Sequence, residues 1–221
     1  MPLLLGPPWK EGPKPDIIKS WFFEPLPCYR PGLFYCIINK ERYCMGRIIF
    51  ITGGARSGKS AFAEKQALQL GSPITYLATA QGGDDEMAER IKLHQERRDE
   101  DWKTIEEPLH LSQALACCDG TTKAVLVDCL TLWLSNLLFL YEDQQEEIEK
   151  RILEDIRRLI TTMRGMQTTL IIVSNEVGMG IVPENRLARL FRDIAGRANQ
   201  MVAAAADEVH VVISGIPLRL K

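Results

Sequence analysis

The chain has 221 residues, of which 46% are hydrophobic and 25% charged, and its formal net charge is −2. This length and apolar fraction predict one globular domain with a full core. The near-neutral charge excludes a broad basic surface, so we expect no nucleic acid as a partner. Uninterrupted apolar runs stay below the roughly 18 residues that a membrane-crossing helix needs, so we also expect no membrane span.

Residues 1–44 differ in composition from the rest, because they contain eight of the twelve prolines. Such Pro-rich sequence forms neither a regular helix nor a central strand, so we expect a poorly ordered extension. Pro7 and Pro8 also interrupt the apolar stretch that a signal peptide requires. Because Met45 directly precedes the first predicted strand, we interpret residues 1–44 as an appendage and 45–221 as the domain. A docking arm is the alternative interpretation.

The six cysteines show no CxxC spacing. Three of them fall in the N-terminal extension, and the other three lie in the domain. Because disulfides are rare in the cytoplasm, we interpret Cys117, Cys118 and Cys129 as reduced structural thiols and expect a cytoplasmic protein.

From Ile48 onward, predicted strands and helices alternate. Their alternation predicts an α/β fold of the P-loop NTPase type, with a mostly parallel sheet and helices on both faces. Pro183 is expected near the first turn of the last helix. The predicted strands are 48–52, 74–79, 102–106, 124–128, 170–174 and 208–213, with a hairpin strand at 216–220. The predicted helices are 59–70, 84–98, 109–117, 130–140, 144–164 and 184–205.

The most specific motif is a P-loop pattern, Gly53-x-x-x-x-Gly58-Lys59-Ser60, between a buried strand and a helix. Its glycines allow backbone N–H groups to point at phosphate oxygens, and the helix adds its positive N-terminal end. We expect Lys59 to reach the β- and γ-phosphates and the Ser60 hydroxyl to ligate Mg²⁺. Arg56 faces either phosphate or water. The predicted nucleotide-binding residues of the loop are Gly53, Gly54, Ala55, Arg56, Ser57, Gly58, Lys59 and Ser60.

Asp128 ends the predicted strand 124–128. A carboxylate in this place can approach Mg²⁺ beside Ser60, as a Walker B Asp does. The alternative is an Asp that caps the next helix, which begins near Thr131.

Asn175 and Glu176 open the segment 175–183, which follows a predicted buried strand. Ligands of parallel α/β sheets bind at the carboxyl ends of strands, so these residues are candidates for substrate contact. A plain mobile loop is the alternative. Arg186 lies on the following helix, where most charges only solvate an exposed face.

His94 shares one face of the predicted helix 84–98 with Met87 and Ile91, so it is expected to point inward. The residue types alone favour a structural histidine here. They assign no function to His110 or His210.

Taken together, these motifs resemble the bifunctional adenosylcobinamide kinase / adenosylcobinamide-phosphate guanylyltransferase family of cobalamin biosynthesis. The resemblance runs from Arg47 to the C-terminus, and residues 1–44 have no counterpart in it. The stretch Asn175–Arg197 is more specific than a P-loop. The matching stretches are Thr52–Ser60, Tyr76–Thr79, Asp84–Ile91 with His94, Trp102–Glu106, Val127–Thr131, Asn175–Arg197 and Ala204–Val209.

The resemblance implies two reactions at one nucleotide site. A nucleoside triphosphate, ATP or GTP, phosphorylates the hydroxyl of the aminopropanol arm of adenosylcobinamide. GTP then donates GMP to that phosphate, which yields adenosylcobinamide-GDP and pyrophosphate. The small-molecule partner is therefore a corrinoid, and the resemblance also implies a homotrimer.

The resemblance reverses the interpretation of His94. In the family, a histidine on the helix after the second strand carries GMP as a phosphoramidate, and His94 occupies that position. The implied catalytic residues are thus His94 and Lys59, while Glu106 and Asp128 are implied to contact GTP or its metal. For the corrinoid we expect contacts from Asn175, Glu176 and Arg186.

Two other functions stay open at this point. One is a single-activity P-loop kinase of another small molecule, in which His94 is structural and no covalent nucleotide forms. The other is a regulatory module that binds nucleotide without turnover.

Overall fold

A seven-stranded sheet organises the described part of this computed structural model, which comprises residues 46–80, 102–144 and 147–221. The strand order is β3-β2-β4-β5-β1-β6-β7. Neighbouring strands pair in parallel, except that β6 and β7 form an antiparallel hairpin. The predicted poorly ordered segment 1–44 and the predicted helix 84–98 lie outside the described residues.

The elements lie close to their predicted positions. Within the described residues the strands are β1 Ile48–Gly53, β2 Ile74–Ala78, β3 Trp102–Glu106, β4 Ala124–Asp128, β5 Thr169–Asn175, β6 Glu208–Ile213 and β7 Ile216–Arg219. The helices are α1 Lys59–Leu70, α3 Leu111–Cys118, α4 Leu130–Leu140, the 3-10 turn η2 Glu142–Gln144, α5 Ile148–Gly165 and α6 Arg186–Ala205.

Three predicted helix starts are wrong, and the first of them is that of α3, which begins at Leu111 rather than 109. The helix predicted from residue 144 begins at Ile148, because the preceding residues are polar and the first buried side chain is that of Ile148. The last helix begins at Arg186 rather than 184, so Pro183 is not in its first turn. Asn185 caps α6 instead: its side-chain oxygen accepts a hydrogen bond from the backbone N–H of Ala188 at 3.1 Å.

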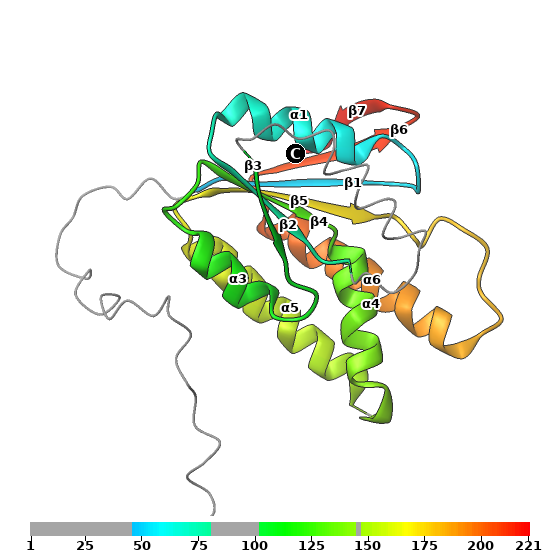
Figure 1. Cartoon of the computed structure of the whole chain (residues 1–221). Helices are drawn as coiled ribbons and strands as arrows, with labels where there is room; N and C mark the ends of the chain where they lie inside the picture. The colour runs from blue at the N-terminus through cyan, green and yellow to red at the C-terminus, as the bar shows by residue number, and fades with distance from the viewer. Residues whose placement is uncertain (1–45, 81–101, 145–146) are drawn as a thin grey trace, which may run out of the picture. The chain divides into compact units, whose positions relative to one another are not determined.

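Helices cover both faces of the sheet, as Figure 1 shows, with α1 on one face and α3, α4, α5 and α6 on the other. The two faces follow from the alternation of side chains along a strand. In β1, Ile48 and Phe50 join the larger hydrophobic cluster, whereas Ile49 and Ile51 join the cluster beneath α1. Among the described residues, no helix has both the length and the apolar character that crossing a bilayer requires.

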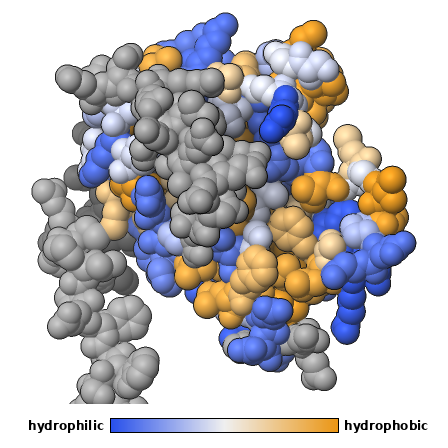
Figure 2. All heavy atoms as spheres, turned by 45° about the vertical axis from the view of Figure 1, so that its right-hand side comes forward, coloured by the Kyte–Doolittle hydropathy of each residue, from blue (hydrophilic) through white to orange (hydrophobic). Residues whose placement is uncertain are grey.

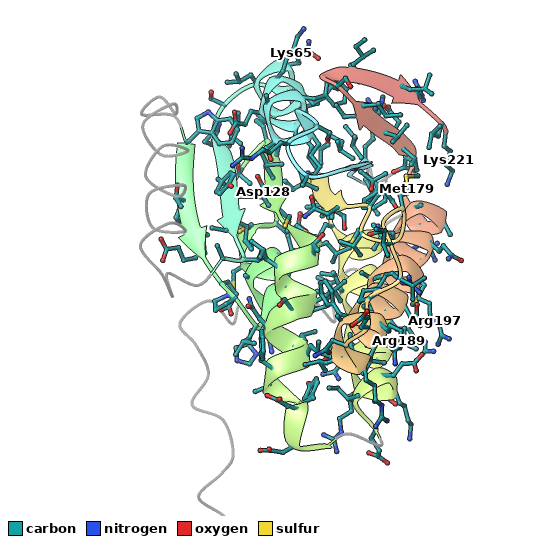
Figure 3. The ribbon with its side chains drawn as sticks, turned by 90° about the vertical axis from the view of Figure 1, so that its right-hand side faces the viewer. Lys65, Asp128, Met179, Arg189, Arg197 and Lys221 are labelled. Carbon is teal, nitrogen blue, oxygen red and sulfur yellow. The ribbon has the colours of Figure 1, made fainter. Side chains whose placement is uncertain are left out.

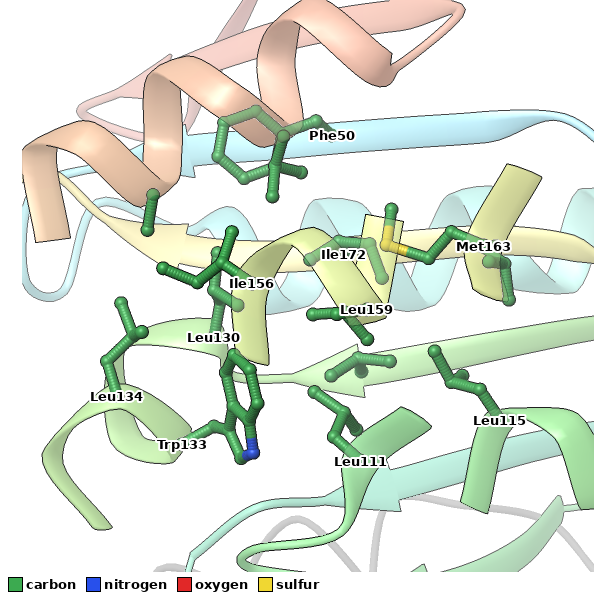
Figure 4. Close-up of a cluster of buried hydrophobic side chains, with 14 of the residues drawn as sticks. Phe50, Leu111, Leu115, Leu130, Trp133, Leu134, Ile156, Leu159, Met163 and Ile172 are labelled. Carbon is green, nitrogen blue, oxygen red and sulfur yellow. The ribbon is translucent and has the colours of Figure 1, made fainter. Parts of the chain in front are cut away.

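The larger cluster lies between the sheet and the helices α3 to α6 (Figure 4). Trp133, Ile156 and Phe50 are among its fully buried large side chains. The indole N–H of Trp133 donates a hydrogen bond to the Leu109 carbonyl at 2.9 Å, so this large ring is buried without an unpaired donor.

The strand order brings the site together. β5 lies between β1 and β4, so the carboxyl ends of these three parallel strands meet at one edge of the sheet. The P-loop follows β1, Asp128 ends β4, and Asn175 ends β5. The candidate residues from three distant parts of the sequence therefore share this edge.

We predict that Ile156→Ala lowers the free energy of unfolding by about 2–5 kcal/mol, because Ile156 is fully buried and its removal leaves a cavity. Urea denaturation measures the change. The control is Glu154→Ala on the exposed face of the same helix, expected to stay within about 0.5 kcal/mol of the wild type. Equal effects of the two substitutions would contradict the assigned burial of α5.

Candidate active site

The P-loop begins at Gly53, the last residue of β1, where a side chain has no room. A Cβ built on Gly53 would lie 2.4 Å from the carbonyl oxygen of Val212 in the neighbouring strand β6. Gly58, with φ at 94°, is the N-cap of α1, in a left-handed conformation that favours glycine. The β6–β7 turn also holds the loop, because the backbone N–H of Gly215 donates to the Ser57 carbonyl at 2.8 Å.

Lys59 is buried at the start of α1, and its Nζ donates a hydrogen bond to the Gly54 carbonyl at 3.0 Å. The amine thus points back over the loop that would surround a phosphate. Burial lowers the pKa of Lys59, whereas the nearby Cys129 and the charge of Asp128 act in the opposite direction. The Lys59 ammonium therefore interacts electrostatically with the Asp128 carboxylate at the end of β4. A bound phosphate would offer this ammonium a stronger hydrogen-bond acceptor than the Gly54 carbonyl does.

Asp128 does not cap the following helix. The N-cap of α4 is Cys129, and no side chain caps that helix by a hydrogen bond. Instead, the hydroxyl of the buried Tyr76 donates to Asp128 Oδ2 at 3.2 Å. The capping alternative for Asp128 is therefore wrong, and its carboxylate faces the side of the sheet that carries α1. Figure 3 labels Asp128 at the end of its strand.

The residues at this edge fit a magnesium ion that binds together with a nucleotide. Mg²⁺ prefers oxygen ligands and is usually held by one or two carboxylates together with substrate phosphates. Asp128 and the hydroxyl of Ser60, one residue into α1, supply protein oxygens of that kind. The described residues contain no group of three or more His, Cys, Asp or Glu that would hold a metal by itself.

Glu106 lies at the same level of the sheet as Asp128. Ala78 of β2 pairs with Glu106 on one side and with Asp128 on the other, so both carboxylates belong to the same edge and the same face. Glu106 is exposed on the outer strand β3. His94, the other residue implied in GTP chemistry, lies outside the described residues.

A hydrogen-bonded chain of polar side chains lies on the opposite face, toward α4 and α6. Glu176 Oε1 accepts hydrogen bonds from Thr52 Oγ1 at 2.7 Å and from Asn199 Nδ2 at 3.1 Å. Asn199 Oδ1 in turn accepts from Ser174 Oγ at 2.7 Å, and Ser174 Oγ lies 3.2 Å from Thr131 Oγ1. The chain joins the ends of β1 and β5 to the helices α4 and α6.

Glu176 is also bound through its backbone, because its N–H donates to the Gly53 carbonyl at 3.0 Å. The first residue of the P-loop and the first residue after β5 are thus in direct contact. Asn175 takes part through its main chain: its N–H donates to Thr131 Oγ1 at 2.7 Å and its carbonyl accepts from Asn199.

Arg186 stands apart from these contacts. It lies exposed at the start of α6 and lines a pocket of about 340 Å³ together with Glu142, Ile148 and Leu190. The exposed Arg56, with φ at 57°, lies at the outer side of the P-loop. Within the described ranges, neither arginine makes a hydrogen bond or ion pair with the residues at the edge where Lys59 and Glu176 lie.

Sequence reasoning missed Tyr76, Thr52 and Asn199. One signal for Asn199 was present: a polar residue on a helix face whose other members, such as Ala198 and Val202, are apolar and buried. The sequence pattern alone does not indicate which carboxylate such a residue contacts.

Cys118 and Cys129 are buried thiols outside any disulfide. Burial raises the pKa of Cys129 to about 11, so its thiol is neutral at physiological pH. This is the structural role that the sequence predicted for these two residues, whereas Cys117, for which it predicted the same role, is exposed.

We predict that Gly53→Ala destabilises the protein by about 1–3 kcal/mol and abolishes nucleotide binding, because its Cβ would overlap the Val212 carbonyl. Thermal unfolding and nucleotide titration measure the two effects. In the control Gly54→Ala the new Cβ meets no atom within 4 Å, so the stability is expected to stay within about 0.5 kcal/mol of the wild type. A stable Gly53→Ala variant that binds nucleotide would contradict the described close approach of Gly53 to the Val212 carbonyl.

Comparisons with known proteins agree with this geometry. The model of the family described as cobinamide kinase / cobinamide phosphate guanyltransferase matches residues 49–220. The chain is 45% identical over 181 residues to the bifunctional adenosylcobalamin biosynthesis protein CobU of Escherichia coli K12, covering 79% of this chain and 99% of the relative. It is 47% identical over 182 residues to CobU of Salmonella typhimurium, with the same coverage.

A third relative, the bifunctional adenosylcobalamin biosynthesis protein CobP of Pseudomonas aeruginosa, is 42% identical over 171 residues, which covers 77% of this chain and 95% of the relative. The resemblance expected from the sequence is therefore confirmed. The described fold, with the P-loop at the carboxyl edge of a mostly parallel sheet, is the P-loop NTPase fold that the sequence predicted. The chain belongs to the cobinamide kinase / cobinamide phosphate guanyltransferase family.

Proposed function

We propose that this chain phosphorylates the aminopropanol hydroxyl of adenosylcobinamide and then transfers GMP from GTP to the new phosphate. Membership of the family supports both activities and disfavours a kinase with a single activity. The observation that carries the proposal is the P-loop itself, in which Gly53 packs against the Val212 carbonyl of β6 and the buried Lys59 points back over the loop. ATP and GTP are the nucleotide substrates of these two reactions.

One nucleotide site can serve both reactions, because the same groups neutralise both leaving groups. In the kinase step the hydroxyl oxygen bonds to the γ-phosphorus and a nucleoside diphosphate leaves. In the second reaction His94 bonds to the α-phosphorus of GTP, pyrophosphate leaves, and the phosphate of the corrinoid then displaces the histidine. Lys59 and the N–H groups of the P-loop stabilise the charge on each leaving group.

Mg²⁺ completes the proposed site, held by Ser60, Asp128 and the phosphate oxygens. When bound, the ion neutralises charge on the phosphate oxygens and polarises the phosphorus. Tyr76 orients the Asp128 carboxylate through its hydrogen bond, and Glu106 lies beside it on the same face of the sheet.

For the corrinoid we propose contacts with the segment that follows β5. Glu176 supports this assignment, because it touches the first glycine of the P-loop through its backbone. Asn175 is its neighbour, and Arg186 borders the pocket at the start of α6.

We further propose a cytoplasmic homotrimer whose catalytic domain is 45–221, with residues 1–44 as an appendage. The buried neutral thiol of Cys129 suits a reducing compartment. Sedimentation equilibrium of the purified chain would measure the oligomeric state.

We predict that GTP labelled at its α-phosphorus transfers radioactive GMP to the wild type and not to His94→Ala. The label should be labile to acid and stable to alkali, as a phosphoramidate is. The control is His110→Ala, because His110 is an exposed N-cap residue with no assigned role. Equal labelling of the wild type and His94→Ala on a denaturing gel would overturn the assignment of His94.

We predict that Asp128→Asn raises the Mg²⁺ concentration for half-maximal activity by at least about tenfold, because a neutral amide is a poorer ligand than a carboxylate. Magnesium titrations of both activities measure this shift. The control is Asp119→Asn, whose carboxylate caps backbone N–H groups at the opposite end of the sheet. An unchanged magnesium requirement in Asp128→Asn would exclude Asp128 as a ligand.

A further inference from the structure

Glu176 is the first residue beyond β5, at the edge of the sheet where the P-loop begins. Its backbone N–H donates to the Gly53 carbonyl at 3.0 Å, and its carboxylate accepts from Thr52, the residue before that glycine. Both contacts fix the carboxylate beside the loop that would hold the triphosphate.

Two neutral donors hold this carboxylate. Thr52 Oγ1 and Asn199 Nδ2 both donate to the same oxygen, Oε1, at 2.7 and 3.1 Å. Within the described ranges, no ion pair joins Glu176 to a lysine, arginine or histidine, and Oε2 accepts no hydrogen bond. Hydrogen bonds from neutral groups orient a carboxylate while leaving its negative charge available to accept a proton.

The other carboxylates at this edge have different surroundings. Asp128 accepts from Tyr76 and lies near Lys59, on the face that carries α1. Glu107 Oε1 accepts the backbone N–H groups of Leu109 and His110, in the turn that precedes α3. Glu176 lies instead on the face toward α4 and α6, away from the groups that neutralise the phosphates.

The loop after Glu176 exposes a large apolar surface. Met179 and Ile181 are 84% and 96% exposed, and Gly180 separates them. Figure 3 shows Met179 on this loop, and Figure 2, turned toward this side of the molecule, shows hydrophobic side chains gathered among hydrophilic ones. Exposed apolar side chains of this kind mark a place where a bulky, partly apolar substrate can dock.

We propose that Glu176 is the general base of the kinase step, an inference that rests on the proposed function. The oxygen of the substrate hydroxyl forms a bond to the γ-phosphorus, and its proton moves to Glu176 Oε2. The bond between the γ-phosphorus and the β–γ bridging oxygen breaks, and its electron pair leaves with the nucleoside diphosphate. Thr52 and Asn199 are positioning residues, because they act by holding Oε1.

The second reaction, the transfer of GMP, does not require a general base. A neutral imidazole attacks the α-phosphorus without first losing a proton, and the phosphate that later displaces it is already an anion. Loss of Glu176 basicity should therefore separate the two activities of one enzyme. A merely structural role would not, because both reactions use the same P-loop.

The test is Glu176→Gln in the full chain. The glutamine keeps an oxygen that accepts from Thr52 and Asn199 and replaces Oε2 with an amide nitrogen that cannot accept a proton. We expect kcat for cobinamide phosphorylation to fall about 10²- to 10⁴-fold, the usual contribution of a general base. Covalent labelling by GTP, the step of the second reaction that involves no corrinoid, should stay within about twofold of the wild type.

The matched control is Glu184→Gln, an exposed glutamate in the same loop, which should leave both activities at the wild-type level. A kinase kcat for Glu176→Gln within about threefold of the wild type would overturn the assignment. A parallel fall of both activities would also overturn it, since that result indicates a structural role. Wild-type protein that phosphorylates no cobinamide would refute the proposed function itself, and the base with it.

Discussion

The hydrogen bond between the Glu176 N–H and the Gly53 carbonyl joins the two segments on which the site depends. Gly53 pairs with Asn175 at the last position of the β1–β5 ladder, so this bond continues the ladder one residue beyond the strands. The Val212 carbonyl leaves no room for a side chain at Gly53, so only glycine fits where β1 leads into the P-loop. A triphosphate in the loop and a side chain at position 176 therefore keep a fixed spatial relation, which is what phosphoryl transfer requires of its reacting groups.

Neutral groups hold the two carboxylates that the proposed mechanism uses. Tyr76 donates to Asp128, while Thr52 and Asn199 donate to Glu176. An arginine in either place would stabilise the carboxylate as an ion pair, and it would compete with a metal ion at one site and with a proton at the other. Hydroxyl and amide donors restrict the rotamers of these side chains without cancelling their charge. The hydrogen-bonded chain through Ser174 to Thr131 also leaves few polar atoms unpaired in this partly buried region, which keeps the arrangement rigid.

The sequence predicted the elements well where one physical signal dominated. The apolar strands and the P-loop of β1 and α1 have strong local patterns, so α1 was predicted at its exact bounds. The starts of α5 and α6 were missed, because tertiary burial at Ile148 and the Asn185 cap, rather than local propensity, decide where those helices begin. Tyr76 and Asn199 could not be assigned to the site, since their contacts with Asp128 and Glu176 connect residues 52 and 23 positions apart. Such pairings depend on the strand order, which residue patterns do not encode locally.

The two faces of the sheet suggest how one site performs two chemistries. Lys59, Ser60 and Asp128 lie on the face of the sheet that carries α1. In the proposed mechanism Lys59 stabilises the negative charge of the leaving group directly, while Ser60 and Asp128 do so through Mg²⁺. Both proposed reactions expel a phosphate leaving group whose charge must be neutralised. Of the three nucleophiles, the hydroxyl, the imidazole and the phosphate of the corrinoid, only the hydroxyl must lose a proton as it attacks. A base on the opposite face, toward α4 and α6, can serve that nucleophile without its carboxylate lying against the leaving phosphates, where like charges would repel. Because β5 lies between β1 and β4, Glu176 stays at the same edge of the sheet as the P-loop and Asp128, while its contacts with Thr52 and Asn199 hold its carboxylate on the other face.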